Sequence, residues 1–139
     1  MSSAVVTLII SIIAVGILVF VAILITQKRG HTFDVVEYQT DFLAIENGLR
    51  RENPASYNMA IVKADKLLDK ALCEMGTPGK TMGDRLKRTG TKFTELNKVW
   101  YAHKLRNQIA HEYNFEADYN QARHALNTYK QALKDLGAI

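Results

Sequence analysis

The chain has 139 residues, with 18 Lys and Arg against 14 Asp and Glu, and its first charged side chain is Lys28. All of the charge therefore lies in the last 112 residues, a length that makes one small domain. This length excludes a multidomain enzyme with a separate cofactor domain. One uncharged hydrophobic segment and one charged domain remain to be interpreted.

The N-terminal segment, residues 4–25, consists almost entirely of Val, Ile, Leu, Phe and Ala. A helix of this length measures roughly 33 Å, enough to cross a hydrocarbon core of about 30 Å. A cleaved signal peptide is disfavoured because no Lys or Arg precedes the run, the run is long, and no small-x-small cleavage site follows it. We expect residues 1–27 to form a retained transmembrane anchor in contact with the lipid bilayer.

Charge next to this segment predicts the orientation of the chain. Lys28 and Arg29 follow the apolar run directly, whereas the three residues before it carry no charged side chain. The positive-inside rule then predicts a single-pass protein of the inner or plasma membrane, with a short N-terminus outside and a cytoplasmic C-terminal domain. The single Cys73 agrees, because small extracellular domains often carry paired cysteines, and we expect Cys73 to lie in the core.

Beyond a juxtamembrane linker, residues 28–33, the sequence predicts an all-α domain over residues 34–139. Apolar residues recur at helical spacing and show no sustained alternation of period two. Five helices are expected, over residues 33–51, 54–75, 81–88, 92–113 and 118–136. Short connections between them favour an antiparallel bundle of four to five helices.

Local signals support these boundaries. Asn53-Pro54 is a strong helix start, with Asn53 as N-cap, and Thr81 with Asp84 resembles a capping box. Glycines at 76, 79 and 90 interrupt helices. The expected inward stripes are Tyr38, Phe42, Ile45 and Leu49; Tyr57, Ile61, Ala64, Leu67, Leu68, Ala71, Leu72 and Met75; and Tyr119, Ala122, Leu126, Tyr129, Leu133 and Leu136.

The segment Gly79-Lys80-Thr81 superficially suggests a phosphate-binding P-loop. That pattern requires a glycine where this chain has Glu74, a carboxylate that would repel phosphate, and a preceding strand where a helix is predicted. We therefore interpret Thr81 as a helix cap and expect no nucleotide at this loop.

The fourth helix carries the informative residues, within the segment WYAHKLRNQIAHEY at 100–113. At 100° per residue the apolar arc contains Val99, Ala102, Leu105, Ile109 and Tyr113. Arg106 falls within that arc, where an unpaired cation would be costly. His103, Asn107 and His111 follow one another at i+4 on the neighbouring stripe, so these residues and Arg106 would line a polar groove beside the core.

Two simpler interpretations of these residues compete with a catalytic one. In the structural interpretation, Arg106 pairs with an acidic residue of another helix and the histidines cap or pack at the surface. In the metal interpretation, His103 and His111 would be about 12 Å apart along a straight helix, too far to share one ion. We therefore expect no metal and no cofactor.

The string Arg106-Asn107-Gln108-Ile109-Ala110-His111-Glu112-Tyr113 resembles the signature of the HEPN superfamily, whose members are all-α bundles. Tyr113, two positions after the histidine, resembles the HEPN toxins of bacterial toxin–antitoxin modules, although such toxins are usually soluble. The resemblance implies a metal-independent ribonuclease that acts as a homodimer. Arg106 would contact the phosphate, Asn107 would orient the imidazole or the phosphate, and His111 would transfer protons.

Other residues receive weaker assignments. His103 is a candidate auxiliary residue. Tyr113 is either a regulatory site modified by an antitoxin or a core tyrosine, and its apolar stripe favours the core. The candidate RNA-facing residues, which could equally form a solvated face, are Lys80, Arg85, Lys87, Arg88, Lys92 and Lys104.

Two functions therefore stay open. The first is a membrane-anchored HEPN-like ribonuclease that cleaves RNA as a dimer with Arg106 and His111, under an unidentified antitoxin or regulator. The alternative is a catalytically silent anchored scaffold, or an RNA- or protein-binding module, of the same fold. A cleft shared by Arg106 and His111 would favour the enzyme, and an Arg106 sealed against a carboxylate would oppose it.

Overall fold

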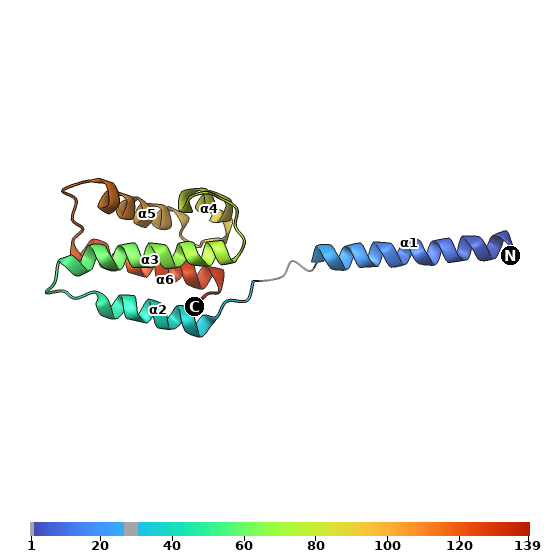
Figure 1. Ribbon diagram of the computed structural model, residues 1–139, viewed down its shortest axis with the longest axis horizontal. Helices are drawn as coiled ribbons and strands as arrows, with labels where there is room; N and C mark the ends of the chain where they lie inside the picture. Colours follow the sequence, from blue (N-terminus) through green and yellow to red (C-terminus); the bar gives the residue numbers. More distant parts are fainter. Residues whose placement is uncertain (1, 27–30) are drawn as a thin grey trace. The chain divides into compact units, whose positions relative to one another are not determined.

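The computed structural model describes residues 2–26 and 31–139, and within these ranges it contains six α-helices, one 3₁₀ turn and no β-strand (Figure 1). The prediction of an all-α protein is therefore confirmed. The chain divides into two units, Met1–Thr32 and Phe33–Ile139. Each unit is described by itself.

The first unit consists mainly of one apolar helix, α1 (Ser3–Thr26). Its span Ser3–Leu24 is long and apolar enough to cross a membrane, a property that a signal sequence shares. The hydroxyl of Thr7 donates to the carbonyl of Ser3 at 3.1 Å, and that of Ser11 donates to the carbonyl of Thr7 at 2.9 Å. Both hydroxyls are thus satisfied within the helix, as an apolar environment requires. The basic residues Lys28 and Arg29, from which the membrane orientation is predicted, lie outside the described residues.

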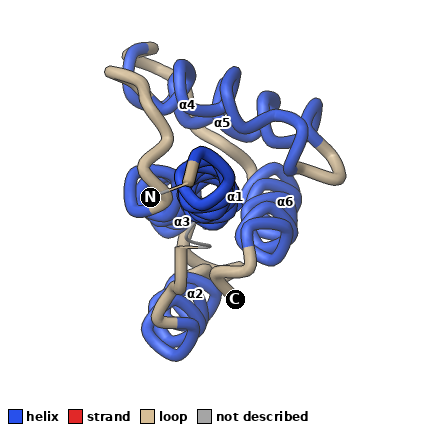
Figure 2. The backbone as a smooth tube through the Cα atoms, turned by 90° about the vertical axis from the view of Figure 1, so that its right-hand side faces the viewer, coloured by secondary structure: helices blue, strands red, loops and turns tan. Residues whose placement is uncertain are grey.

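The second unit is a helical bundle. Figure 1 shows α2 and α5 running in one direction and α3 and α6 in the opposite direction. Viewed along the helices in Figure 2, α3 and α6 lie side by side, with α2 on one side and the α4–α5 segment on the other. The helices are α2 (Val35–Gly48), α3 (Ala55–Glu74), α4 (Met82–Thr89), α5 (Leu96–His111) and α6 (Tyr119–Leu136), with the 3₁₀ turn at Gly90–Lys92.

The predicted start of α4 forms as expected, whereas α3 begins at Ala55 with Pro54 in the N-cap position, one residue later than predicted. Asn53 Oδ1 accepts from the backbone N–H of Ala55 at 3.2 Å, and Pro54 already has a helical φ of −58°. Thr81 and Asp84 exchange side-chain to backbone hydrogen bonds in both directions, a complete capping box. These bonds satisfy amide groups that a helix leaves without internal partners.

Most of the predicted core is buried, and α3 lies at its centre because it packs against α2, α4, α5 and α6. Met75, Tyr119 and Leu136 are only partly buried, and Leu49 packs against the core from just beyond the end of α2. The fully buried large side chains include Tyr38, Phe42, Ile61, Leu68, Leu72, Leu86, Leu105, Tyr129 and Leu133.

Two residues expected in the core are exposed. Cys73 is exposed, because it follows Leu72 on α3 and one residue of rotation carries it off the buried stripe. Tyr113 is fully exposed at 101%, because α5 ends at His111 and the next residue, Glu112, is extended. The interpretation of both as core residues was wrong.

The helix α5 is also shorter at its start than predicted. Residues 92–95 were expected to be helical, but the chain there passes from the 3₁₀ turn into an extended Phe93. Thr94 donates its backbone N–H and its hydroxyl to Asp135 of α6, at 2.8 and 2.9 Å. These contacts with a distant residue, which local propensity does not reveal, hold the segment outside the helix.

Candidate functional site: a polar groove between three helices

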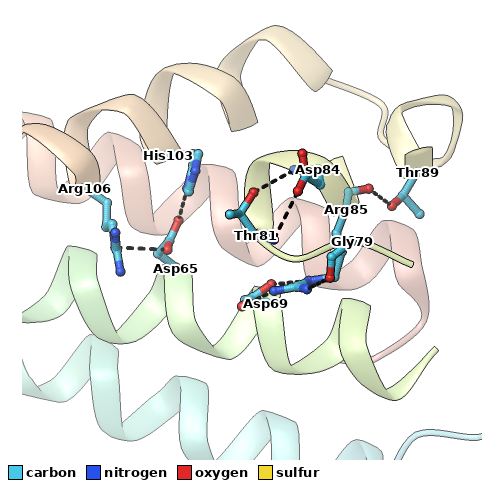
Figure 3. A network of polar contacts seen from close by, with 9 residues as sticks. All are labelled: Asp65, Asp69, Gly79, Thr81, Asp84, Arg85, Thr89, His103 and Arg106. Carbon is cyan, nitrogen blue, oxygen red and sulfur yellow. Dashed lines mark hydrogen bonds and ion pairs between the residues drawn. The ribbon is translucent and has the colours of Figure 1, made fainter. Parts of the chain in front are cut away.

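A buried carboxylate, Asp65 of α3, organises the site. It is only 3% exposed and accepts from the hydroxyl of Tyr129 at 2.9 Å. Its Oδ1 lies 2.8 Å from Nδ1 of His103, and its Oδ2 lies 3.4 Å from Nε of Arg106. Figure 3 shows the carboxylate between the two side chains of α5. Asp65 is therefore the partner that a cation on the apolar arc of α5 requires.

Asp65 is the functional residue that the sequence analysis missed, although the sequence holds a signal for it. It follows Ile61 by four residues and precedes Leu68 by three, so it lies on the buried stripe of α3. A carboxylate on such a stripe is as unusual as the guanidinium of Arg106 on α5. Two opposite charges on two apolar faces indicate that the faces meet and the charges pair.

Three neighbouring side chains of α5 are joined by further contacts. His103 Nε2 lies 3.3 Å from Nδ2 of Asn107, and Asn107 Oδ1 accepts from Nη1 of Arg106 at 3.0 Å. This amide orientation satisfies both contacts when Nδ1 of His103 carries the proton and Nε2 is the acceptor. The geometry therefore fits the tautomer that donates from Nδ1 of His103 to Asp65.

Tyr129 of α6 fixes the other side of the carboxylate. Burial, followed by the nearby charge of Asp65, raises the pKa of the Tyr129 hydroxyl well above its ordinary value. The hydroxyl thus stays protonated and remains a donor to Asp65. The carboxylate is held by groups from α5 and α6 while it is itself carried by α3.

A second ion pair lies one turn further along α3. Asp69 receives two hydrogen bonds from Arg85, 2.7 Å from Nε and 2.9 Å from Nη2, and Nη1 of Arg85 donates to the carbonyl of Gly79 at 2.7 Å (Figure 3). The hydrogen bond to Asp69 raises the pKa of Arg85 above its already high value. Gly79 has φ +156°, and a Cβ there would meet Asp84 Cβ at 2.8 Å, so glycine is required.

The two aspartates, Arg85 and the three joined side chains of α5 border an open groove between α3, α4 and α5, with a volume of about 960 Å³. The predicted residues Arg106, Asn107 and His111 all line it, and His103 lines it too. Arg106 keeps 36% of its side chain exposed, so it is paired but not sealed. The groove is lined by Val62, Asp65, Lys66, Asp69, Lys80, Thr81, Met82, Gly83, Asp84, Arg85, Lys87, Trp100, His103, Arg106, Asn107 and His111.

Of the basic residues predicted to face RNA, Lys80, Arg85 and Lys87 line the groove. Lys80 and Lys87 are exposed and line the groove, whereas Arg85 is 9% exposed and bonded to Asp69. Arg88 borders an adjacent hollow together with Lys80 and Lys87. The groove lining also excludes the exposed residues Lys92, Lys104 and Tyr113.

The charges of the groove leave an excess of positive charge. Asp65 and Asp69 are engaged with basic side chains, and Asp84 is engaged in the capping box of α4. In the part of the chain that the structure describes, no salt bridge engages the three groove lysines, Lys66, Lys80 and Lys87. A groove of this kind attracts anions.

Among residues 2–26 and 31–139, no group of three or more His, Cys, Asp and Glu is arranged to hold a metal ion. No family model matches the chain, and no curated protein or solved structure is significantly similar to it. The contacts and charges of the groove are therefore the basis for assigning a function.

Proposed function

We propose that the chain is a membrane-anchored, metal-independent endoribonuclease that binds RNA in the groove between α3, α4 and α5. One observation carries the proposal: Arg106, Asn107 and His111 line the same open groove as three lysines without salt bridges. In this proposal helix α1 is the membrane anchor, and the basic pair at 28 and 29 supports a cytoplasmic location of the bundle.

The contacts of Arg106 leave donors for a phosphate. Its guanidinium makes one 3.4 Å contact with Asp65 and one 3.0 Å hydrogen bond to Asn107, out of five N–H groups. A guanidinium with free N–H groups at the edge of a groove suits a bidentate contact with phosphate. In the proposed reaction Arg106 stabilises the negative charge that develops on the phosphate as the RNA is cleaved.

The proposed proton-transfer residue is His111. It is exposed at the last position of α5 and borders the groove. Histidine is the side chain that exchanges protons near neutral pH. One imidazole does not act as acid and base at once, so we propose a homodimer that brings two copies of the site together.

The resemblance of residues 106–113 to the HEPN signature supports the same proposal. Its arginine, polar residue and histidine are the three motif residues at the groove. Tyr113 is exposed, and it is thereby accessible for the modification that the toxin-like pattern implies. An unidentified antitoxin or regulator is the partner that would carry out this modification.

One observation favours a second candidate, a catalytically silent scaffold or binding module. The side chains of Asp65, His103, Asn107 and Arg106 contact one another in a closed ring within a single bundle. Such a ring of contacts stabilises the packing of α3 against α5 without any ligand. In that case the arginine is retained for folding rather than for catalysis.

Cleavage of RNA by the full chain in detergent micelles, in the presence of EDTA, tests the proposal. We expect Arg106→Gln and His111→Gln each to remove most of the activity while the melting temperature stays near that of the parent. The matched control is His124→Gln, since His124 is exposed on α6 and does not line this groove. A folded dimer without activity would favour the scaffold, and two fully active variants would show that Arg106 and His111 do not carry out the cleavage.

A further inference from the structure

The groove contains a second imidazole that the proposed reaction does not yet use. His103 lies on α5 two turns before His111, is 9% exposed and borders the same groove. Its environment differs from that of His111, which is exposed at the end of the helix. The two histidines of the groove are therefore suited to different tasks.

The orientation of the His103 ring is fixed on several sides. Asp65 holds Nδ1 at 2.8 Å, and that carboxylate is itself held by Tyr129. The ring also packs edge-on against Trp100, with 6.2 Å between the centroids. A carboxylate on Nδ1 selects the tautomer in which Nε2 carries the lone pair and stabilises the imidazolium that forms on proton uptake.

Among the described residues, the second ring nitrogen of His103 has one weak partner. Its Nε2 lies 3.3 Å from the amide nitrogen of Asn107, beyond the usual range of 2.7–3.2 Å for such a bond. A hydroxyl group that enters the groove can replace this long contact at little cost. The arrangement thus presents an oriented proton acceptor to a ligand.

We propose that His103 is the proton acceptor of the cleavage reaction and that Asp65 is its positioning residue, an inference that rests on the proposed ribonuclease. His103 Nε2 takes the proton of the ribose 2′-hydroxyl, and the 2′-oxygen forms a bond to phosphorus. The bond from phosphorus to the 5′-oxygen breaks, and protonated His111 gives that oxygen a proton. The products are a 2′,3′-cyclic phosphate and a 5′-hydroxyl, and both imidazoles return to their starting states by exchange with water.

The spacing of the two histidines determines which copies cooperate. On one straight helix they are about 12 Å apart along the axis, too far to serve one phosphate easily. Residue 107 is midway between them, so a two-fold axis that crosses two antiparallel α5 helices near Asn107 brings His103 of one copy beside His111 of the other. At each phosphate, one chain then supplies the proton acceptor His103 and the other chain supplies the proton donor His111.

Single variants of the full chain test the role of His103. We expect His103→Gln to lower the cleavage rate on the order of 10²–10⁴-fold, the contribution typical of general base catalysis. Affinity for an uncleavable 2′-deoxy oligonucleotide stays within a few-fold of the parent. Added imidazole should restore part of the activity of His103→Ala, which a residue needed only for folding would not allow. Full activity of His103→Gln would overturn the inference and leave the proposed ribonuclease intact.

The role of Asp65 needs a readout that separates positioning from folding. We expect Asp65→Asn to retain RNA binding but to lose cleavage, and ¹⁵N NMR of the histidines to show that His103 no longer holds its proton mainly on Nδ1. An unchanged tautomer and rate in Asp65→Asn would exclude the positioning role. If this variant fails to fold, His103→Gln together with imidazole rescue of His103→Ala still decides the inference.

Mixing two inactive variants tests the pairing across the two-fold axis. Equal amounts of His103→Gln and His111→Gln, exchanged in detergent, form mixed dimers in which one of the two sites has both imidazoles. We expect the mixture to recover about a quarter of the parent activity, because half of the dimers are mixed and each carries one intact site. No recovery despite subunit exchange would overturn the pairing, and a parent chain that cleaves no RNA would remove both the inference and the proposed function.

Discussion

Two aspartates one turn apart on α3 hold two arginines at the same groove in opposite ways. Asp69 and Arg85 form a bidentate pair at 2.7 and 2.9 Å, and the arginine side chain is 10% exposed. Asp65 and Arg106 meet at 3.4 Å only, and that arginine side chain is 36% exposed. The first pair connects α4 to α3 as a structural contact, whereas the second leaves a guanidinium available to a ligand.

Of the substitutions that test this difference between the two pairs, we expect the one at Arg106 to have the largest effect, and that effect is on activity. We expect Arg106→Gln to lower the cleavage rate on the order of 10²–10³-fold, as loss of a donor to a developing oxyanion does. The slope of the logarithm of RNA affinity against the logarithm of salt concentration should fall by about one, because one phosphate contact is lost. A filter-binding titration at several salt concentrations measures this slope. An unchanged slope would mean that Arg106 does not contact phosphate.

The matched substitution at the second pair should act on stability instead. We expect Arg85→Gln to lower the free energy of unfolding by roughly 1–3 kcal/mol, less than for a fully buried pair because the Asp69 side chain is 29% exposed. In this variant the slope of the logarithm of RNA affinity against the logarithm of salt concentration should match that of the parent. Urea unfolding of the full chain in micelles measures the free energy of unfolding. A loss of RNA cleavage without a loss of stability would remove the distinction between the two pairs.

The fold was largely predictable because each helix of the bundle carries its own local signals. Start signals at Asn53 and Thr81, together with apolar spacing along α3, predicted where these helices lie and which side they bury. The start of α5 was not predictable in this way, because Thr94 is held by Asp135 from a helix some forty residues later. Contacts between distant residues leave no trace in local spacing.

The candidate site was predicted in part. Placing Arg106, Asn107, His103 and His111 on one side of α5 required only helical geometry, and all four border the groove. Asp65 was not predicted as a site residue, although its place on the buried stripe of α3 indicates a charge that needs a partner. The split of the basic cluster, with Arg85 turned into a salt bridge, depends on the packing of α4 and so requires the structure.

An effect on stability of similar size is expected from the third group that holds Asp65. Removing the hydroxyl in Tyr129→Phe takes away one donor at 2.9 Å from a buried carboxylate. We expect the free energy of unfolding to fall by about 1–3 kcal/mol, the cost of leaving such an acceptor with one partner fewer. Thermal and urea unfolding measure it. Because the ring still fills the core, the bundle should remain folded, and stability equal to the parent would show that His103 and Arg106 alone satisfy Asp65.

The smallest effect concerns the capping box of α4, which starts the helix that carries Arg85. Hydrogen bonds from Thr81 lower the pKa of the Asp84 carboxyl below its ordinary value of 3.8. Since the folded pKa is the lower one, this stabilisation is complete above pH 3.8 and is lost as the pH falls through the folded value. Urea midpoints at pH 6 and pH 3 should therefore differ less in Asp84→Asn than in the parent, and Thr81→Val should reduce the difference in the same direction. An equal difference in all three proteins would mean that the Asp84 carboxyl does not contribute to the acid sensitivity of the bundle.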